Sequence, residues 1–167
     1  MKDAVNEPLF RVCALSVAVF DRVNAATAAE VGLGGAAAAA LLCVDQEPGM
    51  TIDQLATLVG VSGSGAVRLV DRLDGSGLVE RRAGTDGRTR HLYVTTPGRR
   101  AARRTFQRRN EMLDAILTPL DDNDRRDLQR VTDKMLAGIE DDTPQVAHLC
   151  RLCDLGDCPE GTCPVRD

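Results

Sequence analysis

Residues 55–98 are LATLVGVSGSGAVRLVDRLDGSGLVERRAGTDGRTRHLYVTTPG. This stretch contains two short helical segments followed by two short extended segments. Gly60 ends the first helical segment, and Ser62 is placed to cap the second, at residues 63–74, before a Gly-Ser-Gly sequence breaks the chain. The extended segments fold back at Asp86-Gly87, a pair that supplies the positive-φ turn of a tight hairpin. This order predicts a helix-turn-helix followed by a β-hairpin wing.

Helical segments flank this lobe on both sides. Apolar residues at helical spacing predict a helix over residues 5–28, and the alanine-rich residues 35–46 predict a second. Further helices are expected over residues 97–118 and 121–140, separated by Pro119. The predicted fold class is mainly α with a small β-hairpin wing. It divides the chain into N-terminal scaffold helices 1–48, a winged helix-turn-helix lobe 49–96, C-terminal helices 97–142 and a cysteine-rich tail 143–167.

Charge is distributed unevenly along the chain. The 167 residues contain 21 Lys and Arg against 25 Asp and Glu, a net charge of −4. Residues 60–110 contain 12 Arg and 4 acidic residues, which gives +8 and leaves −12 for the remainder. Such an asymmetry is typical of a surface that meets polyanions.

The second helical segment has the polar face that a recognition helix needs. On a helical wheel, four polar residues lie opposite the apolar side chains: Ser64, Arg68, Asp71 and Arg72. Arg68 is placed to donate two hydrogen bonds to guanine in the major groove, Ser62 and Ser64 can bond phosphate or a base edge, and Arg72 suits a phosphate. A solvated helix face is the alternative interpretation.

Two further basic elements follow. Arg88 at the hairpin tip and Arg90 on the returning strand suit a minor groove rich in A·T pairs, and Asp86 could hold Arg88 by an ion pair. The alternative is a solvated turn with an incidental ion pair. The arginines of residues 99–109 lie on adjacent helical rows that could follow a phosphate backbone or simply solvate a helix.

Residues 55–98 resemble the winged helix-turn-helix of the multiple antibiotic resistance regulator (MarR) family, above all in RLVDRLDGSGLVERR, DGRTR and VTTPG. With the flanking helices the resemblance covers residues 5–142. It implies a homodimer that binds a pseudo-palindromic operator, usually to repress transcription. It also implies base contacts from Ser62, Ser64, Val67 and Arg68, and entry of Arg88 into the minor groove with Asp86 orienting it. Ala66-Val67 stands where Val-Thr is commoner, which would exchange a polar contact for one with a thymine methyl group.

The tail HLCRLCDLGDCPEGTCPVRD contains four cysteines, Cys150, Cys153, Cys158 and Cys163, spaced C-x2-C-x4-C-x4-C. Four thiols this close together can enclose one metal ion without a hydrophobic core. The spacing is that of a zinc knuckle with Cys158 in place of the usual histidine, so zinc is favoured. An iron–sulfur cluster and a tail of free or partly oxidised thiols remain open. His148 could replace a ligand, bond to a cysteinate or be an ordinary helix-end side chain.

The remaining features of the sequence narrow the class of protein to which this chain can belong. Cys13 and Cys43 are interpreted as small core residues, and the alanine-rich helix lacks the aromatic lining of an inducer pocket, although a small-molecule inducer is possible by resemblance. We find no catalytic constellation, no uninterrupted apolar run of transmembrane length and no signal peptide, and we expect a cytoplasmic protein. The alternatives to a double-stranded DNA-binding regulator are a protein-interaction adaptor and a Cys150-x-x-Cys153 thiol oxidoreductase.

Overall fold

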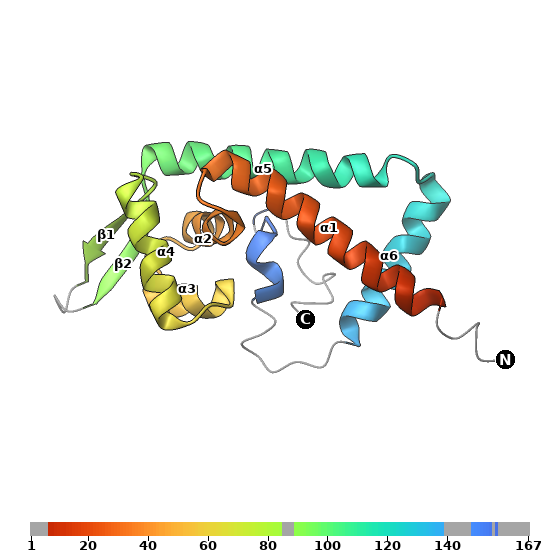
Figure 1. The fold of residues 1–167 in the computed structure, drawn as a ribbon, viewed down its shortest axis with the longest axis horizontal. Coiled ribbons are helices and arrows are strands. Elements are labelled where there is room, and N and C mark those ends of the chain that lie inside the picture. Colours follow the sequence, from red (N-terminus) through yellow and green to blue (C-terminus); the bar gives the residue numbers. More distant parts are fainter. Residues whose placement is uncertain (1–6, 85–88, 139–147, 155, 157–167) are drawn as a thin grey trace.

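The structure, a computed structural model, describes residues 7–84, 89–138, 148–154 and 156 (Figure 1). The mainly α fold with a small hairpin is confirmed. In chain order the elements are α1 (Glu7–Val31), α2 (Gly35–Gln46), α3 (Ile52–Val59), α4 (Gly63–Gly75), β1 (Val79–Ala83), β2 (Arg90–Val94), α5 (Thr96–Leu117), α6 (Asp122–Ala137) and the 3-10 turn η1 (Cys150–Leu152).

Side-chain caps set the boundaries of α3 and α4. The Thr51 backbone N–H donates to Gln54 Oε1 at 2.8 Å, and the Gln54 N–H donates to Thr51 Oγ1 at 3.3 Å, which forms a capping box. Gly60 ends α3 in the left-handed region at φ 73°, where a residue without Cβ is favoured. Ser62 then caps α4. The tight turn of the helix-turn-helix is therefore fixed locally, as the sequence predicts.

The central helix is α2, which contacts α1, α3, α4, α5, β2 and η1. Residues 37–44 are all buried, and their alanines let neighbouring helices approach closely. Leu41 and Leu42 are among the largest fully buried side chains, together with Leu55, Leu73 and Leu92 from the lobe. One hydrophobic core therefore joins the scaffold helices to the helix-turn-helix.

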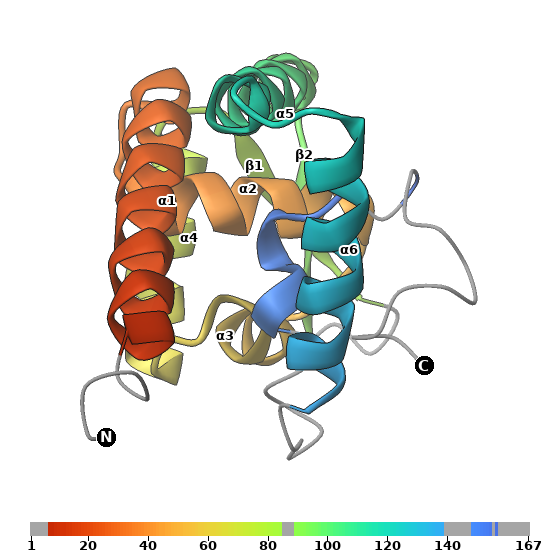
Figure 2. The same cartoon turned by 90° about the vertical axis from the view of Figure 1, so that its right-hand side faces the viewer.

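The long helices frame this core. α1 packs along α5 and crosses α2. Figure 2 shows α1 and α6 on opposite sides of the molecule, with α5 across the top and α2 and η1 between them. An aspartate capping box formed by Asp121 and Asp124 restarts the chain as α6, and none of the residues of α6 is buried.

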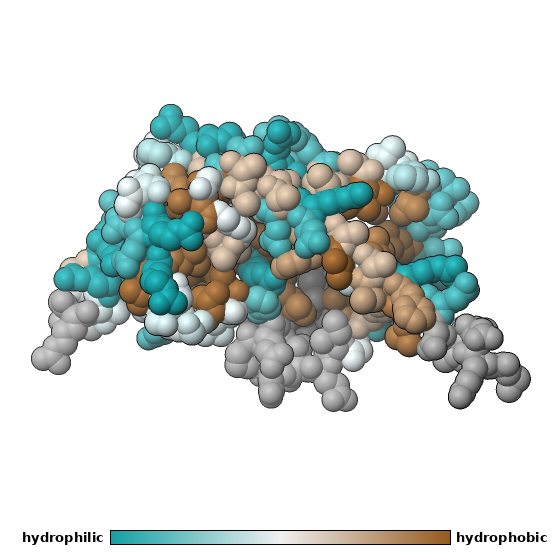
Figure 3. Space-filling view, viewed as in Figure 1, coloured by the Kyte–Doolittle hydropathy of each residue, from teal (hydrophilic) through white to brown (hydrophobic). Residues whose placement is uncertain are grey.

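An apolar surface extends along α1 beyond the core. Val23 and Thr27 face inward and are buried, whereas Leu9 and Val12, which lie on the same face by helical periodicity, are 65% and 44% exposed. Figure 3 shows hydrophobic side chains gathered over α1. We call the exposed members the α1 apolar face: Leu9, Phe10, Val12, Leu15, Val17 and Phe20.

By length and composition alone, α1 also qualifies as a membrane-spanning helix. An 18-residue stretch of it has a mean hydropathy of 1.3, and 11% of that stretch is buried. Asp21 and Arg22 interrupt this stretch, which agrees with the sequence-based expectation of no uninterrupted apolar run of transmembrane length. The helices that form the core of soluble proteins pass the same test, so it is weak evidence for a membrane.

The wing is a two-stranded antiparallel sheet in which Val79 lies opposite Val94 and Ala83 opposite Arg90. This is the register that a turn at Asp86-Gly87 requires. Leu92 also bonds the segment before α3, because its N–H donates to the Met50 carbonyl at 2.9 Å and its carbonyl accepts from the Gly49 N–H at 2.8 Å. The base of the wing is thus attached to the lobe by backbone hydrogen bonds.

After Pro144 the sequence showed no regular period, yet part of the tail is helical. Residues 148–152 form a helical turn that ends in η1, and the Cys153 N–H donates to the Cys150 carbonyl at 2.8 Å. η1 packs against α2 and α3 (Figures 1 and 2). Its position was not predictable from spacing, since the stabilising contacts come from helices much earlier in the chain.

Candidate nucleic-acid interface

The exposed face of α4 carries the side chains that the sequence assigned to recognition. Ala66, Leu69, Val70 and Leu73 are buried. Ser62, Ser64 and Arg68 are exposed, and Val67 is 42% exposed. The predicted division of this helix into a core face and an outward face is therefore confirmed.

The two serines lie at the beginning of α4. Ser62 Oγ accepts a hydrogen bond from the Gly65 N–H at 3.1 Å and lies 3.3 Å from Ser64 Oγ. A hydroxyl that accepts from the backbone still has a proton to donate. The N-terminus of a helix also favours anions, so this end of α4 can receive a phosphate oxygen.

The two arginines of α4 differ in their surroundings. Within the described residues, Arg68 forms no hydrogen bond or ion pair and projects from the exposed face. Arg72 donates from one guanidinium nitrogen to the Leu33 carbonyl at 2.6 Å, which ties α4 to the loop between α1 and α2. Arg68 is thus fully available to a ligand, whereas Arg72 has part of its donor set engaged within the chain.

Arg81 has a role that the sequence analysis missed. It donates to Asp71 at 2.5 Å and lies 3.9 Å from Asp74, so it links β1 to the outward side of α4. This contact neutralises two carboxylates that would otherwise repel a phosphate backbone. Opposite charges on either side of the Gly-Ser-Gly turn were the only signal in the sequence, and the pairing depended on how the wing folds back.

Two more arginines of the wing, Arg82 and Arg90, differ in their surroundings. Arg82 donates to Glu80 and lies over the ring of Tyr93, with 4.3 Å between its guanidinium carbon and the ring centroid. Arg90 is exposed at the end of β2. Asp86 and Arg88 lie outside the described residues, so their assignment to the minor groove stays a prediction.

The arginine-rich start of α5 divides into two groups. Arg104 and Arg108 pair with Glu30 of α1, at 3.1 Å and 3.3 Å, and Arg108 also pairs with Glu111. Hydrogen bonding to Glu111, and then to Glu30, raises the pKa of Arg108. These two arginines therefore hold α1 against α5, whereas Arg99, Arg100 and Arg103 are exposed nearer the lobe.

Asp45 of α2 lies near Arg99 and Arg103, at the start of α5. Burial raises the pKa of its carboxyl, while Arg99 and Arg103 act in the opposite direction and Asp154 of the tail raises it further. Asp45 Oδ1 is buried and has no hydrogen-bond partner in the described part of the chain. The arginines at the start of α5 thus offset only part of the effect of burial on this carboxyl.

The tail cysteines are only partly described. Cys150 is half-buried and Cys153 is exposed, whereas Cys158 and Cys163 lie outside the described residues. Among the described residues, no group of three or more potential ligands that could hold a metal ion is found. The four-cysteine site therefore stays a prediction from spacing.

The other two cysteines differ in exposure. Cys43 is a buried core residue, as predicted, and its thiol lies 3.8 Å from the Arg151 carbonyl. Burial, followed by the nearby charge of Glu47, raises the pKa of Cys43 to about 12. Cys13, which was interpreted as a small core residue, is exposed because the N-terminal half of α1 extends past the core.

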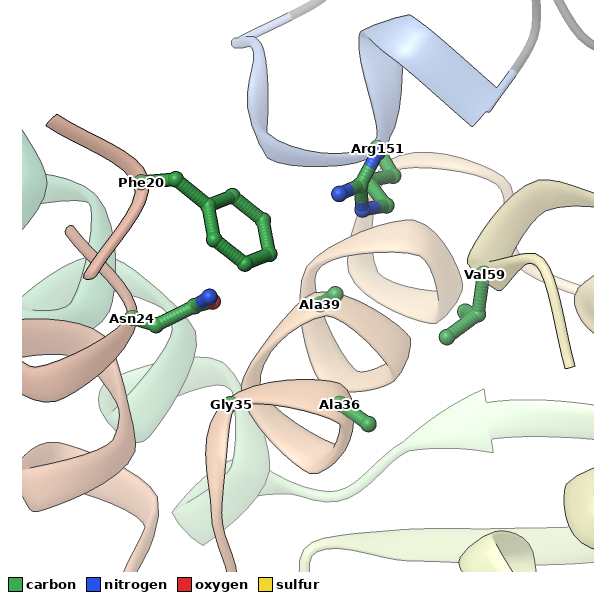
Figure 4. A pocket seen from close by; sticks show the side chains of 7 residues that line it. All are labelled: Phe20, Asn24, Gly35, Ala36, Ala39, Val59 and Arg151. Carbon is green, nitrogen blue, oxygen red and sulfur yellow. The ribbon is translucent and has the colours of Figure 1, made fainter. Parts of the chain in front are cut away.

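A pocket opens between α1, α2, α3 and η1 (Figure 4). It has a volume of about 300 Å³, and Phe20, Asn24, Val59 and Arg151 line it together with small residues of α2. The guanidinium of Arg151 lies 6.0 Å from the centroid of the Phe20 ring. The prediction that an aromatic lining is lacking was made from the sequence of α2 alone. In the structure the aromatic ring, Phe20, comes from α1, and the cation, Arg151, comes from the tail.

Comparisons with known proteins place this geometry in a family. A model of the MarR family matches residues 31–89. A comparison with curated proteins finds no significant match. Among solved structures, a MarR-family transcriptional regulator from Silicibacter pomeroyi is 26% identical, with a TM-score of 0.63 over 84% of this chain and 97% of that one.

Two further solved structures share the fold. The YusO protein of Bacillus subtilis is 17% identical, with a TM-score of 0.69 over 80% of this chain and 95% of that one. A MarR family protein of Mycobacterium tuberculosis, in complex with p-aminosalicylic acid, is 24% identical, with a TM-score of 0.59 over 76% of this chain and 94% of that one.

A recognition helix, an adjacent wing and long flanking helices define the class of winged helix-turn-helix transcriptional regulators. The winged helix-turn-helix of this chain matches the MarR family model, and the chain has the fold of that family's regulators. The resemblance stated from the sequence is confirmed, apart from the cysteine tail.

Proposed function

We propose that this protein is a homodimeric repressor that binds a pseudo-palindromic operator in double-stranded DNA. The observation that carries the proposal is the outward face of α4, where Arg68 has no partner among the described residues and stands beside Ser62, Ser64 and Val67, next to the wing. The capping geometry, the Arg81 ion pairs and the backbone bonds of Leu92 hold these parts in a fixed arrangement. We expect the protein in the cytoplasm, where its DNA is.

The α1 apolar face supports a dimer. In one protomer these side chains face solvent. On α6, which has no buried residue, Val131 and Met135 are also 43% and 46% exposed. Exposed apolar patches of this kind mark interaction surfaces. A second copy related by a twofold axis would cover them and present two recognition helices to successive major grooves.

Each site residue has a defined role in this proposal. Arg68 donates two hydrogen bonds to a guanine, and Val67 contacts a thymine methyl group. Ser62, Ser64, Arg72 and Arg90 bind phosphates, and Arg88 enters the minor groove with Asp86 orienting it. Base readout thus comes from two residues of α4, whereas the other contacts fix the position of the lobe on the duplex.

The experiment that tests the proposal measures binding of the full chain to duplexes selected from a random library. A dimer that contacts several phosphates should lose affinity steeply as the salt concentration rises. Arg68→Ala should reduce affinity for the selected duplex by about 1–3 kcal/mol and relax the base preference at one position. Arg11→Ala, on the exposed N-terminal part of α1, is the matched control and should bind as the wild type does.

Two outcomes would contradict the proposal. One is a chain that selects no sequence and binds duplex without salt dependence, which the adaptor interpretation predicts. The other is equal affinity of the wild type and Arg68→Ala. Arg88→Ala separately tests the wing, since it should weaken binding to a selected duplex without changing the free energy of unfolding.

We further propose that Cys150, Cys153, Cys158 and Cys163 bind zinc, with an iron–sulfur cluster as the alternative. The Cys153 N–H donating to the Cys150 carbonyl gives the first pair the compact turn on which two thiols can share one metal. Metal analysis and the visible absorption spectrum after oxygen-free purification test this. A colourless protein with one zinc per chain supports the proposal, brown colour with iron and sulfide selects the cluster, and metal-free thiols contradict both.

A small-molecule inducer is the last component of the proposal. The pocket between α1, α2, α3 and η1 combines the Phe20 ring with the Arg151 guanidinium, which suits a small aromatic acid. The M. tuberculosis protein of the same fold, which is bound to p-aminosalicylic acid, makes that compound the probe to use. Weaker duplex binding in its presence supports the proposal, and unchanged binding at millimolar probe contradicts it.

A further inference from the structure

The segment 148–154, which we call the tail segment, contacts both halves of the molecule. α3 belongs to the DNA-binding lobe, whereas α1 and α5 belong to the long-helix scaffold, and α2 lies between them. The tail segment packs where these parts meet (Figures 1 and 2). It contacts α3 on one side, and α2, α5 and α1 on the other.

The contact with α3 is made by His148. Its Nδ1 lies 3.1 Å from the Leu58 carbonyl. This carbonyl is in the last turn of α3, where carbonyls lack a partner within the helix. The ring also lies against Gly60, because a Cβ at that position would come within 2.5 Å of His148 Cε1. The tail segment therefore contacts the turn that joins the two helices of the helix-turn-helix.

The contacts with α2 and α5 are made by the next turn. Cys43 Sγ of α2 lies 3.8 Å from the Arg151 carbonyl, and a guanidinium nitrogen of Arg109 from α5 donates to the Leu152 carbonyl. The Leu152 side chain packs against the hydrophobic core. Two consecutive carbonyls of the tail segment are thus held by side chains of two different scaffold helices.

Arg151 extends the bridge to α1. Its side chain lines the pocket with Phe20 of α1 on one side and Val59 of α3 on the other, as Figure 4 shows. One of its nitrogens donates to the His148 carbonyl at 2.8 Å, which closes the turn on itself. Burial lowers the pKa of Arg151, which reflects a guanidinium partly removed from water.

We propose that the tail segment is a strut that holds the DNA-binding lobe against the scaffold helices, and that Cys150 and Cys153 decide whether the strut is docked. The consequence for DNA binding rests on the proposed function, whereas the docking itself does not. With the strut docked, the lobe has one orientation relative to α5, and the two lobes of a dimer have one spacing. With the strut released, that orientation is no longer fixed.

The thiols control docking because they bracket the turn that makes the contacts. Arg151 and Leu152, whose carbonyls are held by α2 and α5, lie between Cys150 and Cys153. A turn this short has little helical stability of its own. A metal ion held by both thiols would fix its geometry, and the binding free energy of the metal would contribute to docking.

Cys43 provides a readout of docking in the full chain. It is 5% exposed, and the tail segment covers its sulfur. Labelling by N-ethylmaleimide therefore requires local opening, and a tenfold rise in the opened population raises the rate about tenfold. The rate is measured by mass spectrometry of the Cys43 peptide. His148→Ala and Leu152→Ala should accelerate it, whereas Leu149→Ala, which removes a side chain 41% exposed in the same turn, should leave it unchanged.

A pair of glycine variants separates displacement of the strut from backbone strain. Gly60 and Gly77 both have positive φ, at 73° and 67°, so alanine is strained at either position. Only at Gly60 does the new methyl group meet His148, since nothing lies within 4 Å of a Cβ at Gly77. Gly60→Ala should accelerate Cys43 labelling more than Gly77→Ala does. Equal rates in the two variants would overturn the His148 contact.

The thiol arm uses Cys150→Ser and Cys153→Ser, with Cys13→Ser as the control because Cys13 is exposed on α1. Both tail variants should label Cys43 at least about tenfold faster than the control and should bind a selected duplex more weakly. Unchanged Cys43 labelling in these two variants overturns the control of docking by the thiols, and faster labelling with unchanged duplex affinity overturns the regulatory role of the strut. If no variant, the wild type included, binds a duplex, the proposed function fails while the labelling result still decides whether the strut exists.

Discussion

Arg81 is the residue whose role changes most once its surroundings are known. Among the arginines of residues 60–110 it looks like one more DNA ligand. In the structure it pairs with Asp71 at 2.5 Å and also lies near Asp74. Its side chain is 28% exposed, so water screens this ion pair less than it screens the pairs on α1 or α6. Arg81 is therefore a positioning residue that connects the wing to the recognition helix.

We expect Arg81→Ala to lower the free energy of unfolding by about 1 kcal/mol, because it removes a partly shielded ion pair and leaves Asp71 without a partner. Urea denaturation measures this. Arg82→Ala is the control, since Arg82 is 59% exposed and pairs with a neighbour on its own strand. An equal effect of the two substitutions would contradict the positioning role.

Cys43 provides a prediction about pH. The folded chain raises the pKa of this thiol from 9.0 to about 12, so between those values the unfolded chain loses the proton while the folded chain keeps it. The stability contributed by the buried thiol is present below pH 9 and is lost as the pH rises toward 12, by up to about 1.4 kcal/mol per unit.

The measurement is the difference in unfolding free energy between the wild type and Cys43→Ala at several pH values above 8. This difference should decrease as the pH rises, because only the wild type carries the thiol. Val44→Ala, at a neighbouring buried position without a titratable group, should give a constant difference. A constant difference for Cys43→Ala would show that burial does not control the ionisation of this thiol.

At the scale of elements, the junction between the wing and α5 has the least free space. Gly98 lies in the first turn of α5, and a Cβ there would fall 1.9 Å from the Leu78 carbonyl oxygen. The same carbonyl accepts from the Thr95 N–H at 3.0 Å, and Thr95 caps α5. The start of the long helix is therefore locked against the start of β1, which sets the direction in which the wing leaves the scaffold.

Gly98→Ala should lower the free energy of unfolding by about 3 kcal/mol or more, because a backbone carbonyl cannot move aside as a flexible side chain can. Thermal and urea denaturation both test this. Gly63→Ala, at the first position of α4 with nothing within 4 Å of its Cβ, should change the free energy by less than about 0.5 kcal/mol. A tolerated Gly98→Ala would mean that α5 and β1 can separate.

At the scale of the whole molecule, the apolar surface of α1 determines what the chain can assemble with. The face that is buried at Val23 and Thr27 continues toward the N-terminus without a partner from the described residues. A homodimer in which α1 pairs with the second copy would bury this surface, and the spacing of the two lobes would then depend on that interface.

We expect Val12→Asp to raise the dissociation constant of the dimer at least about tenfold, since it places a charge in an apolar interface. Analytical ultracentrifugation measures this, and duplex affinity should fall in parallel. Ala25→Asp, exposed on the same helix with no member of the α1 apolar face within four positions of it, should leave the dimer intact. Equal sedimentation of the two variants would place the dimer interface elsewhere.

Much of the lobe was predictable because its determinants are local. Caps, glycines and periodicity set the helices around Thr51, Gly60 and Ser62, and the strands of the wing pair in the register that a turn at Asp86-Gly87 requires. The sequence also predicted which side chains of α4 face outward. It did not predict that Arg104 and Arg108 pair with Glu30, because that contact depends on how α1 lies along α5.

By itself, the sequence determined the identity and order of the helices, the wing and the outward face of α4, since each depends on interactions within a few residues of the chain. Only the tertiary structure decided which arginines are engaged within the protein, that Cys13 is exposed, and that His148 contacts the helix-turn-helix. These outcomes depend on segments far apart in the sequence coming together, and local patterns carry no information about such distances.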